Sequence, residues 1–162
     1  RIVYGFGGVI AYKNIDFNFF FQGTADAHRV IGNSTIFLPG SGTTVQGNAY
    51  SENLDDRWTD DNQDPYAFWP RLTYGPNKNN YRASTWWKKD MSFLRLKTVE
   101  IGYTFPKKWM EKIYSKGARV FVSGNNLLCF SPFKLWDPEL GTNNGLKYPM
   151  NRSILFGIDI NF

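Results

Sequence analysis

The chain has 162 residues, of which 42% are hydrophobic and 18% aromatic, and it carries a formal net charge of +5. No apolar run is long enough to cross a bilayer as a helix, so any membrane contact must be made by strands. The only cysteine, Cys129, excludes an internal disulfide and a thiolate metal cluster, and the scattered basic residues predict a solvated surface rather than nucleic-acid binding.

The first two expected strands form a hairpin. Residues 2–12 and 15–23 are rich in aromatic and β-branched side chains, and only Lys13 and Asn14 separate them, which is the length of a tight turn. One face of the second run is entirely apolar, and the other is polar except for Phe20; the apolar row consists of Ile15, Phe17, Phe19 and Phe21. Lipid would cover such a row without further structure, so the hairpin is expected to lie in a membrane.

A long polar loop is expected from residue 24 to about residue 89, where Gly, Asn, Asp, Thr, Ser and Pro predominate. Long connections in membrane barrels face the outside and are generally functional. Four tryptophans among its amides and carboxylates are candidates for contact with a ligand or a partner protein: Trp58, Trp69, Trp86 and Trp87. In the alternative interpretation, the last two form an interfacial girdle and the first two a small core within the loop.

The rest of the chain predicts three more strands, at residues 92–105, 118–128 and 151–162. The alternation of the first of these slips between Leu94 and Lys97, which predicts a β-bulge. Pro106 is expected to begin a single helical turn before the next strand. The connections are alternately short and long, as in an antiparallel barrel. The predicted fold class is therefore all-β, with about five strands of a large transmembrane β-barrel.

The final strand alternates strictly, with small and polar residues on one face and an apolar row on the other: Ile154, Phe156, Ile158, Ile160 and Phe162. This pattern is typical of a barrel wall between lipid and water. At the other end, Arg1 already begins strand-forming sequence, without an initiator Met or a signal peptide. We therefore expect residues 1–162 to be a C-terminal piece of a larger protein.

Residues with catalytic or metal-binding potential do not form a recognisable site. Asp60–Asp64 are rich in carboxylate and amide oxygens, but Pro65 and Arg71 stand where a calcium loop needs glycine and glutamate, so only a looser calcium site stays open. The single histidine, His28, lacks a nucleophile motif. Asp137 and Glu139 are expected to fix their own loop. We predict no enzyme activity, no cofactor and no metal.

Several of these segments resemble the C-terminal part of the SusC/RagA family of TonB-dependent outer-membrane transporters. The resemblance is strong in residues 92–106, 118–127, 137–139, 148–149 and 152–162. It is weaker in Arg57-Trp58-Thr59 with Asn62, in Pro70-Arg71-Leu72, and in the hairpin residues 12–16 and 21–23. It implies a barrel of the 22-stranded class that encloses a plug. The plug, the remaining barrel and the segment that contacts the TonB complex would lie outside this sequence.

The resemblance also implies a function and partners. The whole protein would import glycans or peptides across the outer membrane of a Gram-negative bacterium, surrounded by outer-membrane lipid. A SusD-like surface lipoprotein would be its partner, and the TonB complex would energise transport. Four residues resemble the C-terminal signal that the barrel-assembly machinery recognises: Phe162, Ile160, Ile158 and Phe156. The alternative is an amphipathic strand without a signalling role.

Two other functions stay open from the sequence. A siderophore-type TonB-dependent receptor would share the barrel architecture, and the family-specific segments argue against it. A soluble carbohydrate-binding β-sandwich would also explain the aromatic residues and the alternation. It would require polar outer faces, whereas the phenylalanine row and the final apolar row are expected to face lipid.

Overall fold

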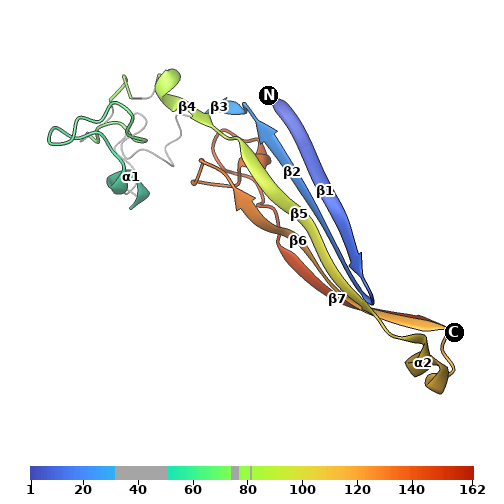
Figure 1. Cartoon of the computed structure of the whole chain (residues 1–162). Helices are drawn as coiled ribbons and strands as arrows, with labels where there is room; N and C mark the ends of the chain where they lie inside the picture. Colours follow the sequence, from blue (N-terminus) through green and yellow to red (C-terminus); the bar gives the residue numbers. More distant parts are fainter. Residues whose placement is uncertain (32–50, 74–76, 81) are drawn as a thin grey trace. The chain divides into compact units, whose positions relative to one another are not determined.

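Five long antiparallel strands dominate the computed structural model, which describes residues 1–31, 51–73, 77–80 and 82–162 (Figure 1). They form a single sheet in the order β1-β2-β5-β6-β7. Every neighbouring pair is antiparallel. The five predicted strands are confirmed close to their predicted ends, as β1 (Ile2–Tyr12), β2 (Ile15–Ala25), β5 (Phe93–Thr104), β6 (Gly117–Phe130) and β7 (Ser153–Asn161).

The smaller elements lie in the connections. The loop between β2 and β5 contains the two-stranded sheet of β3 (His28–Val30) and β4 (Lys88–Asp90), the helix α1 (Glu52–Asp55) and the 3₁₀ turn η1 (Thr85–Trp87). The helical turn predicted after Pro106 is confirmed as α2 (Lys107–Met110) followed by η2 (Glu111–Ile113), and η3 (Pro138–Leu140) lies between β6 and β7. None of the helices in the described ranges has the length and apolar character needed to cross a membrane.

The register places the apolar rows of all five strands on one face of the sheet. Tyr103 of β5 lies opposite Ile15 of β2 and Val120 of β6, and Val120 lies opposite Ile158 of β7. Many side chains of these rows are exposed, such as Phe156 at 80%, whereas the phenylalanine row of β2 is half-buried. Covering one such side chain with an apolar medium is worth about 1.5–3 kcal/mol, so the face requires lipid or protein against it.

The opposite face carries most of the polar side chains of the sheet, together with apolar residues such as Val9 and Leu155. Two phenylalanines on this face each pack over a glycine. Phe20 of β2 lies opposite Gly7 of β1, where an added Cβ would come within 2.5 Å of the Phe19 carbonyl oxygen and 3.1 Å of the Phe20 ring. Phe121 of β6 lies opposite Gly157 of β7, where an added Cβ would overlap the Phe121 ring. Each ring fills the space that its glycine leaves open, which explains the interruption of the polar row at Phe20.

The predicted bulge is confirmed at Lys97. In β5, Thr98 pairs with Phe20 and Leu96 pairs with Phe21, so the sheet register skips Lys97. The pairing with β6 also shifts between Leu96 and Thr98. Leu94 and Leu96 differ in sequence parity from Val99 and Ile101, and the extra residue places all four side chains on the apolar face. Lys97 itself pairs with neither neighbouring strand.

The chain divides into two compact units. The sheet unit comprises residues 1–27, 90–140 and 147–162, and the loop unit comprises residues 28–89 and 141–146. The loop unit has its own small apolar core of Ile31, Ala67, Trp69 and Trp87. The buried apolar residues of the sheet unit include Met91, Phe93, Leu96, Met110 and Phe133.

Candidate functional site

The structure brings the four candidate tryptophans together in the loop unit, but it buries them to different extents. Trp69 and Trp87 are 3% and 4% exposed, and their rings pack edge to face with centroids 6.2 Å apart. Trp58 and Trp86 are partly exposed. Trp69 and Trp87 therefore belong to the core of this unit, and contact of any of the four with a ligand or partner stays a prediction.

Backbone hydrogen bonds position these side chains. The Trp58 N–H donates to the Trp69 carbonyl at 3.0 Å, and the Trp69 N–H donates to the Asp56 carbonyl at 2.9 Å, which holds the two segments side by side. The Trp87 indole Nε1 donates to the Asn80 carbonyl at 2.9 Å. The Ile31 N–H donates to the Trp87 carbonyl at 2.9 Å. The hydrogen bond of the Trp87 indole therefore fixes the orientation of that ring before any ligand arrives, and the backbone bonds hold the segments of Trp58 and Trp69 together.

Trp58, Trp86 and Trp87 line one cavity of about 600 Å³ in the loop unit. This volume lies within the range of pockets for small ligands. Its polar lining was not predicted from the sequence and consists of Arg71, Asn79, Asn80, Arg82 and Ser84. Flat indole rings beside amides and guanidinium groups can stack on a sugar or aromatic ring and bind its polar substituents.

Some polar groups of this cavity already have hydrogen-bond or ion-pair partners within the described part of the protein, and the Trp86 indole N–H does not. Arg71 forms an exposed ion pair with Asp60 at 2.9 Å, and the Asn80 side chain donates to the Arg71 carbonyl at 3.0 Å. The Nε1 of Trp86 is buried and has no hydrogen-bond partner among the described residues. A buried donor without a partner is costly, so a ligand acceptor at this position would be stabilising.

Lys89, the last residue of the loop unit's main segment, has its ammonium on an aromatic face. Its Nζ donates to the Phe68 carbonyl at 2.9 Å and lies 3.9 Å from the centroid of the Phe68 ring. Burial lowers the pKa of Lys89 to about 8, although the carboxylate of Asp56 acts in the opposite direction. This lysine is therefore only partly charged slightly above neutral pH.

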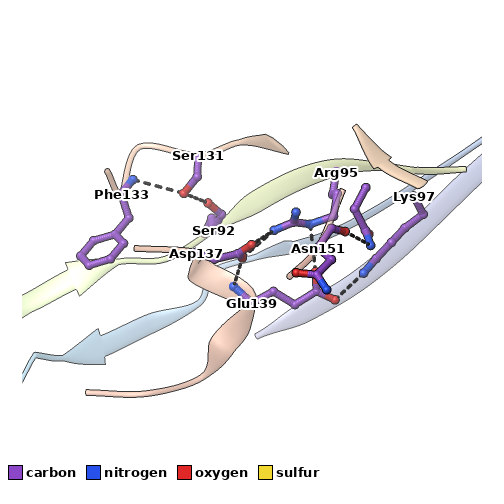
Figure 2. A network of polar contacts seen from close by, with 9 residues as sticks. Ser92, Arg95, Lys97, Ser131, Phe133, Asp137, Glu139 and Asn151 are labelled. Atoms are coloured by element: carbon purple, nitrogen blue, oxygen red, sulfur yellow. Dashed lines mark hydrogen bonds and ion pairs between the residues drawn. The ribbon is translucent and has the colours of Figure 1, made fainter. Parts of the chain in front are cut away.

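A second polar constellation joins the polar face of the sheet to the loop after β6 (Figure 2). Arg95 of β5 is buried, and its Nη2 donates to both carboxylate oxygens of Asp137, at 2.5 and 2.6 Å. Its Nε lies 2.9 Å from a carboxylate oxygen of Glu139, close enough for an ion pair but not aligned for a hydrogen bond. Lys97, the bulged residue, donates to the other Glu139 oxygen at 2.6 Å.

The same carboxylates shape their own loop. Asp137 accepts a hydrogen bond from the Glu139 backbone N–H at 3.0 Å, which forms a tight turn at the start of η3. The Ser131 hydroxyl donates to the Ser92 carbonyl at 2.8 Å and ties the start of the loop to β5. The prediction that Asp137 and Glu139 fix this loop is confirmed, and their partners are two β5 cations that the sequence did not identify.

Arg119 of β6 forms a third cluster on the polar face of the sheet. Its guanidinium pairs with Asp16 of β2, and it donates to Glu100 of β5 at 2.7 Å. Asp159 of β7 lies 4.0 Å from the same guanidinium. One arginine therefore links four strands, and this cluster carries an excess of negative charge.

The predicted assembly signal lies on the edge strand β7 and immediately after it. Phe156, Ile158, Ile160 and Phe162 share the apolar row and are between 51% and 80% exposed. In the described sheet β7 pairs only with β6. This exposed row on an open edge is what a receptor for unfolded barrel strands would contact, and its signalling role stays a prediction.

The acidic segment of the loop unit is engaged in local contacts. Asp60 pairs with Arg71, and Asp64 accepts a hydrogen bond from the Tyr66 N–H at 2.8 Å. Within the described ranges, no three His, Cys, Asp or Glu side chains are grouped so that they could hold a metal ion.

Comparison with known sequences identifies relatives over almost the whole chain. No family model matches it. It is 33% identical over 176 residues to TonB-dependent receptor P26 of Formosa agariphila, covering 99% of this chain and 17% of that protein. It is 23% identical to TonB-dependent receptor SusC of Bacteroides thetaiotaomicron, covering 99% of this chain and 15% of that protein. The chain thus spans about one sixth of the length of these curated relatives.

Comparison with solved structures gives the same result. A chain in the structure of the RagAB peptide importer in the "open-open" state superposes with a TM-score of 0.75 and 27% identity, over 99% of this chain and 17% of that chain. A chain in the structure of the RagAB peptide transporter superposes with a TM-score of 0.73 and 29% identity. The amphipathic sheet, its register and both comparisons therefore place this chain in the SusC/RagA family of TonB-dependent outer-membrane transporters, as part of the β-barrel.

Proposed function

We propose that the chain is the C-terminal wall of an active importer in the outer membrane of a Gram-negative bacterium. One observation carries the proposal: a five-stranded sheet has one apolar, largely exposed face and one mainly polar face, and this chain superposes over 99% of its length on a RagAB chain. The polar face would line the lumen and the apolar face would contact lipid. The plug and the segment that contacts the TonB complex would belong to the rest of the protein.

The connections define an orientation for this wall. In outer-membrane barrels short turns face the periplasm and long loops face the outside. The Lys13–Asn14 turn and residues 105–117 would accordingly lie in the periplasm. The loop unit and the loop fixed by Arg95 would lie at the cell surface, where a SusD-like lipoprotein would deliver glycans or peptides.

The tryptophan-lined cavity of the loop unit is our candidate for contact with the substrate or the lipoprotein. Trp58 and Trp86 offer partly exposed rings, and Trp87 closes the wall from the core side. Trp69 would support Trp87 from behind. Removing an exposed indole that stacks on a ligand is expected to weaken binding roughly tenfold, which corresponds to about 1–1.5 kcal/mol.

The test uses the full-length protein and its bacterial host. We expect uptake of a glycan or peptide substrate that requires TonB, and co-purification of a surface lipoprotein in mild detergent. Uptake that persists without TonB would overturn the importer proposal. Uptake restricted to ferric siderophores would show that the substrates are siderophores rather than glycans or peptides.

The cavity is tested separately by the variants Trp58→Ala and Trp86→Ala. We expect weaker binding of the substrate or the lipoprotein with unchanged expression and heat-modifiable mobility of the barrel. Trp109→Ala is the matched control, because it removes an exposed tryptophan from the sheet unit. Unchanged binding in both loop variants would exclude the cavity as the contact site and leave the importer proposal intact.

A further inference from the structure

The apolar face of the sheet continues beyond the end of β5 into the following turn. Tyr103 lies on that face, and its ring packs edge to face with that of Phe105, with centroids 5.4 Å apart. The Phe105 ring in turn packs against Trp109 of α2 at 6.3 Å. Trp109 is 57% exposed at the end of this aromatic row. A tryptophan at the margin of a lipid-facing surface is typical of the level of the lipid headgroups.

Lysines accompany this tryptophan. Lys107, Lys108 and Lys112 are exposed, and the ion pairs found in the described part of the chain include none of the three. Glu111 is the single acidic residue between Phe105 and Gly117. The turn therefore carries uncompensated positive charge, unlike the Arg95 and Arg119 clusters, where each cation has carboxylate partners.

The β1–β2 turn, which carries a lysine–aromatic pair, lies beside the end of β5. The Asn14 side chain donates to the Thr104 carbonyl at 2.6 Å, and the Thr104 N–H donates to the Asn14 carbonyl at 2.8 Å. These bonds hold the β1–β2 turn against the end of β5. There the Lys13 ammonium lies 5.1 Å from the centroid of the Tyr12 ring, and Tyr12 is 68% exposed on the lipid-facing side.

We propose that this rim, formed by Lys13, Lys107, Lys108, Lys112 and Trp109, binds the phosphate headgroups of anionic glycerophospholipids. The charge of the lysines matches the lipid phosphate, and Trp109 fixes the depth of the turn at the headgroup layer. The proposal rests on the orientation inferred above, which places the rim at the periplasmic leaflet. Each lysine near an anionic surface is expected to strengthen the interaction roughly fivefold.

The test measures which lipid lies beside Trp109. The full-length protein is reconstituted into vesicles of dibrominated phosphatidylcholine, which quenches neighbouring tryptophans, and unbrominated phosphatidylglycerol is titrated in. The signal of Trp109 is the difference between the parent protein and Trp109→Phe. We expect phosphatidylglycerol to displace phosphatidylcholine from Trp109 with a preference on the order of a hundredfold or more, because each of the four lysines contributes roughly fivefold.

Charge-matched variants distinguish the rim from a general surface effect. The combined Lys107→Gln, Lys108→Gln and Lys112→Gln variant should lower the preference to about fivefold, the contribution that Lys13 retains. The control combines Lys78→Gln, Lys88→Gln and Lys134→Gln, which removes three exposed lysines elsewhere and should leave the preference unchanged.

Three results would overturn the proposal. They are no preference in the parent protein, an unchanged preference in the rim variant, and relief of quenching by inorganic phosphate alone, which would indicate a simple phosphate site. Heat-modifiable mobility verifies that each variant is a folded barrel. The assay involves no uptake, so its failure is distinguishable from failure of the importer proposal.

Discussion

Neutralising Asp137 should release the loop that follows β6. The Asp137→Asn variant keeps the shape of the side chain, and its remaining oxygen can still accept the Glu139 N–H. It loses the charge that faces Arg95, whose side chain is only 3% exposed, across contacts of 2.5 and 2.6 Å. Hydrogen bonds between charged groups contribute about 1.5–3 kcal/mol each. Because Arg95 keeps its ion pair with Glu139, we expect a loss of about 2 kcal/mol rather than the larger cost of an isolated buried charge.

Hydrogen exchange measures this loss directly. A change of about 2 kcal/mol in local opening corresponds to roughly thirtyfold faster amide exchange in residues 131–140 of the full-length protein in detergent. The amides of Phe133 and Glu139 are informative, because both donate to side chains within this loop. The strands of the sheet should retain their protection, since the change is confined to the loop.

The Asp60→Asn variant is the control for this prediction. It breaks the ion pair with Arg71, in which both side chains are about 60% exposed, so the expected loss is below about 1 kcal/mol. Equal protection of residues 131–140 in Asp137→Asn and the parent protein would refute the conclusion that the carboxylate holds the loop. If each substitution accelerated amide exchange around its own ion pair to the same extent, the role given to the burial of Arg95 would be refuted.

Three further changes test other parts of the structure. Gly157→Ala should lower the urea midpoint of barrel unfolding, because its Cβ would overlap the Phe121 ring. Adding Phe121→Ala to this variant should recover most of the lost stability. A Gly157→Ala barrel of parental stability would contradict this packing. Arg119→Gln should cost about 1–3 kcal/mol in the same assay, because its carboxylate partners then face one another without a cation, and an Arg119→Lys variant should lose less. Lys89 should react with acetic anhydride with a midpoint near pH 8, because burial lowers its pKa from 10.5. Between these values the folded state binds fewer protons than the unfolded state, so the stability of the loop unit should rise with pH across this window; a midpoint near 10.5 would refute the burial argument.

The strands and their faces were predictable because their signal is local. Successive side chains of a strand point to opposite sides, so the rows of Phe17 to Phe21 and Ile154 to Phe162 identify the lipid-facing surface without any knowledge of the pairing. Even the bulge at Lys97 was visible, as a slip in parity between Leu96 and Val99. Pro106 marked the start of the helical turn for an equally local reason, its fixed φ angle.

The partners of charged residues were not predictable in the same way. Arg119 and Asp16 are 103 positions apart, and Arg95 and Asp137 are 42 positions apart. Nothing in the neighbourhood of either arginine indicates which carboxylate it meets, because the match depends on the register of several strands. The exception at Phe20 likewise had no local explanation, since its cause is a glycine on the neighbouring strand.

The lining of the tryptophan cavity was likewise predictable only in part. The sequence identified Trp58, Trp86 and Trp87 by their residue type and their polar surroundings, but it did not indicate that Arg71 and Arg82 face them. The sequence by itself determined the strands, the lipid-facing rows and the family, because period-two alternation and short motifs are properties of neighbouring residues. Only the tertiary structure decided which tryptophans are buried and which charges meet, because these depend on contacts between segments far apart in the chain.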